Sequence, residues 1–267
     1  MLTFLLVCAS AVIAIAVALD SISIGGDSRP TCFVESSNGR VRLSPEQMGN
    51  AAVIAGVGAD MGASDRAITI ALATAMQESS LRNLDHGDRD SLGLFQQRPS
   101  QGWGSEDQVQ DRVYASTAFY SRLLELPGYA DMPLTQAAQA VQISAFPEAY
   151  AKHEPLAEAL HTTFSGASPG NLNCTLEAST EFDPAVFLSE LAEAHPAARA
   201  RAAGEEITVF PRAAGEGEPR DLWVLAHWAV ATAAETGADS VRVADQVWTR
   251  ADGWQPASST ISHVAVH

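Results

Sequence analysis

A single glutamate at the end of an apolar stretch is the residue in this sequence best suited to acid–base chemistry. In the segment ALATAMQESS, residues 71–80, Ala71, Ala75 and Glu78 recur at helical spacing and would share one stripe of a helix. Glu78 would emerge beside the buried face, where burial should raise its pKa. A carboxylic acid that keeps its proton can give it to the leaving oxygen of a glycosidic bond. The alternative is a solvated or ion-paired Glu at a helix end.

Two short motifs lie at and after this glutamate. Glu78 belongs to QESS at residues 77–80, and GLFQQ follows at residues 93–97. On these motifs, the region from about residue 44 to 164 resembles the superfamily of soluble lytic transglycosylases and goose-type lysozymes. Those proteins place a catalytic Glu-Ser at the end of a helix and follow it with Gly-Leu-Met-Gln. Phe95 stands here in the place of the Met.

The resemblance implies roles for individual side chains. Glu78 would be the general acid/base in cleavage of peptidoglycan strands at the MurNAc-GlcNAc β-1,4 bond. Gln96 would hydrogen-bond sugar substituents, and Ser79 and Gln97 would belong to the same substrate site. No cofactor is implied.

Two aromatic residues further along the chain are candidates for the same site. The superfamily carries Ala-Tyr-Asn with its Tyr near the glutamate; this chain lacks the tripeptide, and Tyr150 is the nearest Tyr after an Ala. Ser144 is an alternative at the equivalent point. Trp103, in a Gly-rich loop, could stack on a sugar face or fill the space between the loop and the helices.

The number of carboxylates at the site separates two mechanisms. A transglycosylase uses one acid, because the acetamido group or a hydroxyl of the substrate itself makes the attack. A hydrolase positions water, commonly with a second carboxylate. Asp85, Asp88 and Asp90 could supply one, but aspartates in a polar loop more often form turns. The sequence therefore favours the single-acid mechanism and leaves hydrolysis open.

The elements that would position Glu78 are two helices close in sequence. Ser44, Pro45 and Gln47 form a capping pattern that begins the first helix, and Gly62 ends it. Ser64 caps the second, which carries Glu78 near its end.

The rest of this region is also expected to be helical, apart from residues 84–104, whose polar and glycine-rich composition suits a small β-hairpin or an ordered loop. Further helices are predicted at residues 107–126, 134–145 and 155–164.

Composition changes after residue 164. A stretch rich in Gly, Ser and Pro at residues 165–180 marks a boundary; helices then open near Asp183 and Asp221, and short strands follow from Val241. Four Trp residues in this part suit a core better than a sugar-binding surface. The prediction is a mainly α fold, with a lysozyme-like helical domain over residues 44–174 containing a small β-hairpin and a small α+β domain of unknown function over residues 175–267.

The N-terminus indicates export. Residues 2–19 are uncharged and almost wholly apolar, so residues 1–19 are expected to be a signal peptide or a membrane anchor. Small residues at 16–18 slightly favour cleavage. Residues 20–43 would then be a linker, and the mature protein would be secreted or held at the cell surface, touching a membrane only through this segment.

Cys32 and Cys174 bracket the expected helical domain. An even pair in an exported chain is expected to oxidise, so they are predicted to form a disulfide. Two unpaired thiols are the alternative.

Charge and spacing limit the possible partners. The net charge of −16 disfavours nucleic acid, because too few Lys and Arg are present to neutralise phosphates. No metal is predicted, since neither the calcium-loop order nor a paired-His spacing occurs. The expected partner is a peptidoglycan strand, although an acidic enzyme gains no electrostatic attraction to an anionic wall. A catalytically inactive wall-binding module is the alternative function.

Overall fold

The computed structural model describes residues 29–143, 147–179, 181–211 and 218–267. The predicted signal peptide or anchor at residues 1–19 and the candidate Ser144 lie outside these ranges. Among the described residues, no helix has both the length and the apolar character needed to cross a membrane.

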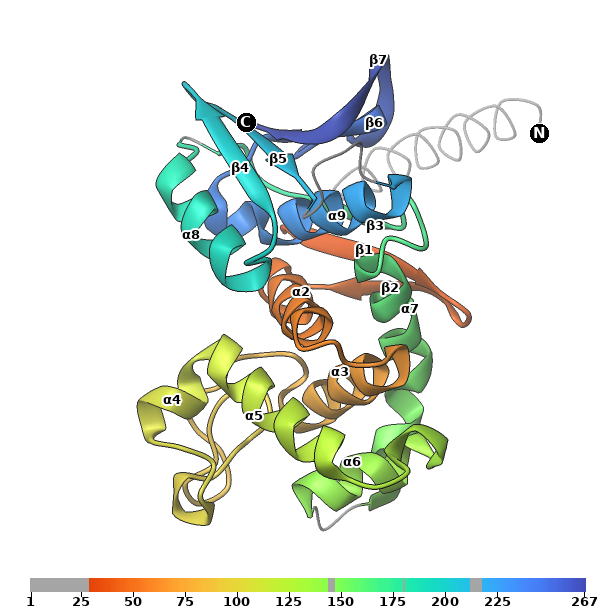
Figure 1. Cartoon of the computed structure of the whole chain (residues 1–267), viewed down its shortest axis with the longest axis vertical. Helices are drawn as coiled ribbons and strands as arrows, with labels where there is room; N and C mark the ends of the chain where they lie inside the picture. The colour runs from red at the N-terminus through yellow and green to blue at the C-terminus, as the bar shows by residue number, and fades with distance from the viewer. Residues whose placement is uncertain (1–28, 144–146, 180, 212–217) are drawn as a thin grey trace, which may run out of the picture. The chain divides into compact units, whose positions relative to one another are not determined.

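Residues Thr31–His267 form one compact unit, in which a run of helices follows the first two strands and most of the strands lie in the C-terminal part of the chain (Figure 1). In chain order its principal elements are β1 (Thr31–Ser36), β2 (Gly39–Leu43), α2 (Pro45–Asp60), α3 (Asp65–Ser79), α4 (Glu106–Gln110), α5 (Arg112–Glu125), α6 (Leu134–Gln142), the 3₁₀ helix η3 (Pro147–His153), α7 (Glu154–Phe164), β3 (Leu172–Thr175), α8 (Pro184–Ala194), β4 (Arg199–Ala203), β5 (Glu206–Phe210), α9 (Pro219–Thr236), β6 (Ser240–Thr249) and β7 (Gly253–Val266).

The prediction of a mainly α fold is wrong. The structure is about half helical and is a mixed α+β fold, with a three-stranded antiparallel sheet in the order β2-β1-β3 and a four-stranded antiparallel sheet in the order β4-β5-β7-β6. Residues 31–43, expected within a linker, form β1 and β2. Strands β4 and β5 were not predicted. β4 (RARAA) lacks the β-branched and aromatic residues typical of strands, whereas β5 (EITVF) has them but is only five residues long.

The two helices around the candidate glutamate follow their local signals. The Ser44 hydroxyl accepts a hydrogen bond from the backbone N–H of Gln47, and the Gln47 side chain accepts one from the backbone N–H of Ser44, which completes the predicted capping box. Ser64 caps α3 in the predicted place. Both helix starts are therefore confirmed.

The helix predicted at residues 107–126 is two helices. It breaks at Asp111, which has an extended backbone and whose carboxylate accepts a hydrogen bond from the Tyr114 N–H to begin α5. An aspartate that can cap a new helix competes with continuation of the old one. In residues 84–104, Leu92 and Gln97 pair in an isolated antiparallel bridge, in agreement with the expected hairpin or ordered loop.

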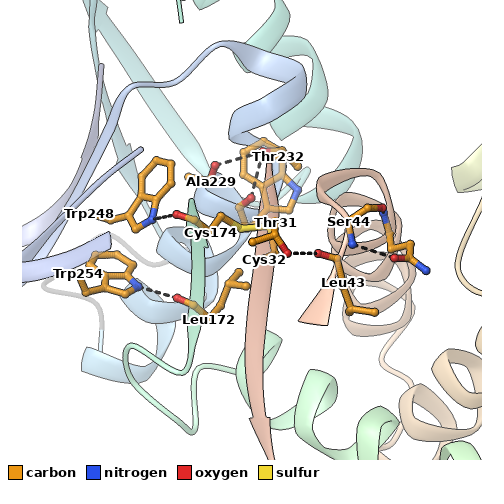
Figure 2. Close-up of a disulfide and its surroundings, with 12 residues drawn as sticks. Thr31, Cys32, Leu43, Ser44, Leu172, Cys174, Ala229, Thr232, Trp248 and Trp254 are labelled. Atoms are coloured by element: carbon orange, nitrogen blue, oxygen red, sulfur yellow. Dashed lines mark hydrogen bonds between the residues drawn. A yellow bond between two sulfur atoms is a disulfide. The ribbon is translucent and has the colours of Figure 1, made fainter. Parts of the chain in front are cut away.

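The disulfide between Cys32 and Cys174 is confirmed (Figure 2). The two cysteines are directly opposite each other on β1 and β3, and both are fully buried. The Trp248 indole donates a hydrogen bond to the Cys174 carbonyl at 3.1 Å, and Trp254 donates one to the Leu172 carbonyl at 2.7 Å. The disulfide thus links two strands of the first sheet, and the two indole hydrogen bonds link that sheet to β6 and β7.

Helix α9 joins the C-terminal part to the rest of the unit. It packs against α2, α7 and the strands β3, β6 and β7. Trp223, Trp228 and Trp248 are buried, which confirms the expectation that these residues form core rather than a sugar-binding surface.

A fully buried histidine on α9 makes the fold sensitive to acid. The His227 Nδ1 is 2.8 Å from the Thr163 carbonyl oxygen, so Nδ1 carries the proton, and Nε2 has no partner among the described residues. Burial lowers the pKa of His227 to about 4, and the bond to Thr163 offsets only part of this shift.

Stability should fall as pH drops through the range set by this histidine. The unfolded chain, with a His pKa near 6.5, binds more protons than the folded chain between about pH 6.5 and 4. The free energy of unfolding should decrease by roughly 3 kcal/mol from this group across that range. Urea denaturation at several pH values should show a shallower dependence for His227→Gln than for the wild type. Equal slopes in the variant and the wild type would refute the assignment.

Candidate functional site

Glu78 lies one residue before the end of α3, half-buried, on the stripe predicted for it. Ala71 and Ala75 on the same stripe are fully buried. Ser80 closes the helix in the left-handed conformation, at a φ of 55°. The helix therefore ends immediately after it has brought the carboxyl group to the edge of the core.

Two hydrogen-bond donors hold the Glu78 carboxyl group. The Tyr150 hydroxyl donates to Glu78 Oε1 at 2.6 Å, and the Gln142 side chain also hydrogen-bonds the carboxyl group. Burial raises the pKa of Glu78, while the bonds from Tyr150 and Gln142 lower it by less. Among the described residues, burial and these two hydrogen bonds account for the shift. The predicted direction of the pKa change is confirmed, and the group is a candidate proton donor.

The partners of Glu78 come from two elements distant in sequence. Tyr150 is fully buried in η3, so its hydroxyl has a fixed direction. Gln142 is the last residue of α6, and its Nε2 donates to the Phe95 carbonyl at 2.7 Å. The position of Tyr150 beside the glutamate agrees with the expectation, but Tyr150 does not line the cleft, so its assignment as a substrate-binding residue is corrected to that of a partner of Glu78. Gln142 was missed, because a single Gln at the end of an amphipathic helix carries no signal of its partner.

A cleft of about 530 Å³ opens at Glu78, within the range of small-ligand pockets. Three of the predicted site residues, Glu78, Gln96 and Trp103, line it. The full lining consists mostly of polar and charged side chains: Glu78, Asp88, Arg89, Ser91, Gln96, Arg98, Gln101, Trp103, Gln142 and Ile143.

Gln96 reaches the cleft through a tight loop. Its backbone is left-handed, with a φ of 49°, and its Nε2 is 3.3 Å from the carbonyl oxygens of both His86 and Gly93. A Cβ at Gly87 would lie 2.6 Å from the Ser91 carbonyl oxygen, so only glycine allows the loop to close this tightly around Gln96. The Gln96 amide is thus fixed at the cleft wall.

Two predicted site residues have structural roles instead. Gln97 is 1% exposed and donates to the Ala115 carbonyl, and the buried Ser79 hydroxyl is 3.0 Å from the Ala75 carbonyl oxygen and 2.7 Å from that of Leu94. Neither lines the cleft. Gln96 ends the turn with a left-handed backbone, and Gln97 begins the bridge to Leu92, so the two neighbouring side chains take different directions. Ser79 and Gln97 were therefore assigned wrongly to the substrate site; their hydrogen bonds hold the loop of residues 93–97 in place.

Trp103 combines the two roles that the sequence left open. It is 6% exposed, and the Arg122 guanidinium carbon lies 3.3 Å from the centre of its ring. One face is therefore covered, while the residue still contributes to the cleft lining. A sugar could touch its exposed edge but could not stack on the face that Arg122 occupies.

The three aspartates of the loop differ in their surroundings. Asp90 accepts hydrogen bonds from the Arg98 guanidinium and the Ser100 N–H, and these contacts hold its pKa far below the usual range. Asp85 pairs with His86 at 2.7 Å, which lowers the Asp85 pKa. Asp88 alone among the three lines the cleft. It is the carboxylate available for a second role.

Replacing Tyr150 by Phe should move the titration of Glu78 to higher pH. The Tyr150 hydroxyl stabilises the ionised carboxylate and so lowers the pKa of Glu78. Without this hydroxyl, the increase caused by burial is offset by one hydrogen bond fewer, and the pKa rises further. Carboxyl ¹³C NMR of the wild type and of Tyr150→Phe would measure the shift directly. Tyr129→Phe, at a hydroxyl that bonds Ser64 instead, is the matched control and should leave the Glu78 titration unchanged. A downward shift in Tyr150→Phe would contradict this account.

Among the described residues, no group of three His, Cys, Asp or Glu side chains could hold a metal ion. The groups at the cleft include one half-buried carboxylic acid with its tyrosine hydroxyl partner, side-chain amides, the exposed Asp88 carboxylate and the guanidinium groups of Arg89 and Arg98. The sequence matches no protein-family model, and no curated protein matches it.

Proposed function

We propose that this chain is an exported peptidoglycan-cleaving glycosidase of the lytic transglycosylase type, with Glu78 as its general acid/base. The observation that carries the proposal is the half-buried Glu78 carboxyl group, which has a raised pKa and lies at a cleft lined by Gln96 and Gln142. A carboxylic acid of this kind supplies the proton that a glycosidic oxygen needs on leaving. The resemblance around residues 77–80 and 93–97 indicates the substrate.

The proposed reaction uses Glu78 twice. It first donates its proton to the bridging oxygen between two sugars, and the bond from the sugar carbon to that oxygen breaks. It then accepts a proton from a hydroxyl of the same sugar, which attacks the carbon and closes an anhydro ring. The carboxyl group is regenerated without water. Tyr150 stabilises the ionised form between these steps, since its hydroxyl donates to Glu78 Oε1.

Asp88 supports a second candidate, hydrolysis. It lines the same cleft and is exposed, so it could orient a water molecule on the sugar opposite the acid. Asp85 and Asp90 are each paired with a neighbouring side chain at 2.7 Å, whereas the contact between Asp88 and Arg89 is longer, at 3.9 Å. Hydrolysis would therefore depend on Asp88 alone.

Mass spectrometry of muropeptides from purified cell wall tests the proposal. Anhydro ends after incubation with the protein would support the transglycosylase reaction, and free reducing ends would support hydrolysis through Asp88. Wall that is bound and not cut would refute both and favour the wall-binding module.

The expected extracellular location fits this choice of substrate. The Cys32–Cys174 disulfide is consistent with an extracellular protein, because such bonds persist in oxidising compartments. Secretion with a cleaved signal, or retention by residues 1–19 as an anchor, would each bring the cleft to the cell wall. The net charge of −16 gives no long-range attraction to an anionic wall, so recognition is proposed to rest on contacts within the cleft.

A further inference from the structure

An isoleucine at the edge of the Glu78 cleft is more exposed than any other large hydrophobic residue that the structure describes. Ile143 is 83% exposed, and the next such residue, Val186 on α8, is 39% exposed. Ile143 lines the cleft that contains Glu78, whereas Val186 does not. A single exposed apolar residue is common on protein surfaces, so the exposure of Ile143 gains its significance from its position in the cleft lining.

The backbone of Ile143 is also unfavourable for its residue type. It adopts the left-handed conformation, with a φ of 54°, and its N–H bonds the Gln139 carbonyl to close α6. Gly or Asn makes this type of helix end without the steric conflict that a β-branched side chain introduces. Ending the helix therefore does not require Ile, and the exposed side chain adds little packing to the fold.

The position of the preceding residue shows what this conformation achieves. Gln142 hydrogen-bonds both the Glu78 carboxyl group and the Phe95 carbonyl, so the end of α6 is fixed at the site. A left-handed turn directly after Gln142 places an apolar side chain in a lining that is otherwise polar apart from Trp103. Strained residues of this kind gather at ligand-binding sites, where the ligand supplies the missing contact.

We propose that Ile143 packs against a methyl group on a substituent of the bound amino sugar and so determines specificity. This inference rests on the proposed function. Two substituents of peptidoglycan sugars carry a methyl group: the acetamido group, present on both sugars, and the lactyl ether, present on one. Either would bury its methyl against the isoleucine while its polar atoms face the amides of Gln96 and Gln142.

Replacing Ile143 by Asn should weaken sugar binding without weakening the fold. Asn tolerates the left-handed conformation, so the melting temperature should stay equal or rise. Loss of one apolar contact should lower kcat/KM on purified wall about 10-fold, mainly through KM. Val186→Asn, at the other exposed site, should leave both unchanged. Unchanged kinetics in Ile143→Asn would overturn the proposal.

Binding measurements identify the substituent and separate the two proposals. In the Glu78→Gln background, Ile143→Asn should weaken binding of a chito-oligosaccharide about 10-fold if the acetamido methyl makes the contact. If the lactyl methyl makes it, only binding of wall glycan should weaken. If the wild type cuts wall and Glu78→Gln binds the glycans equally well with and without Ile143→Asn, the Ile143 contact is refuted and the proposed function is not. Wild-type protein that neither cuts nor binds would refute the proposed function and this inference with it.

Discussion

Replacing Glu78 by Gln should abolish cleavage of cell-wall strands while leaving wall binding intact. The amide keeps the shape of the side chain and can still hydrogen-bond Tyr150, but it cannot donate and recover a proton. Loss of a general acid/base lowers rates by about 10²–10⁴-fold. Release of soluble muropeptides, measured as initial rate against enzyme concentration, would show the loss, and a wall pull-down would show retained binding.

Glu125→Gln provides the matched control for this experiment. Glu125 is exposed at the end of α5 and does not line the cleft. The same chemical change there should leave the cleavage rate within about twofold of the wild type. If Glu78→Gln cuts wall as fast as this control, Glu78 is not the acid/base. If neither variant nor the wild type cuts, the chain is a binding module.

The parts of the fold that the sequence predicted are those fixed by neighbouring residues. The starts of α2, α3 and α8 depend on the caps Ser44, Ser64 and Asp183, each of which satisfies backbone N–H groups two or three residues away. Such bonds form between residues close in sequence and can be recognised without knowing the fold.

The first sheet was missed because it depends on distant pairing. Strands β1 and β2 contain polar residues and a turn, which by composition resemble a linker. Their partner β3 lies more than 120 residues away, in a stretch that also has the composition of a boundary. A strand is defined by its partner more than by its own composition. The predicted Cys32–Cys174 disulfide was the one signal linking the two, and it placed the ends of this stretch side by side.

The candidate site shows the same division. The α3 stripe predicted that Glu78 would be half-buried, because that follows from helical spacing alone. The distinction between Gln96, which lines the cleft, and Gln97, which lies in the core, depends on which way one short loop turns. Gln142 and Ile143 gain significance only because α6 ends beside α3. Spacing within one helix is readable from sequence, whereas contact between helices is not.

Removing the disulfide should cause the largest loss of stability. The bond closes a loop with a sequence separation of 142 residues, and the chain-entropy account of so long a loop gives about 3–5 kcal/mol. Both sulfurs are buried between β1 and β3, so Cys32→Ala with Cys174→Ala also removes packed volume. Urea denaturation of this double variant, followed by tryptophan fluorescence, should show a midpoint well below that of the wild type. Trp248 fluorescence reports directly on the surroundings of the disulfide, because its indole donates a hydrogen bond to the Cys174 carbonyl.

Reduced wild-type protein separates the effect of the crosslink from that of the lost volume. Reduction opens the loop and keeps both sulfur atoms, so it should account for most of the destabilisation seen in the double variant. The fall in the free energy of unfolding should then appear with little change at the Glu78 cleft, since no residue of β1 or β3 lines it. A double variant within about 1 kcal/mol of the wild type would contradict the chain-entropy argument. It would mean that pairing of β1 with β2 and β3, together with the indole bonds to β3, holds the two ends of this loop together without the covalent bond.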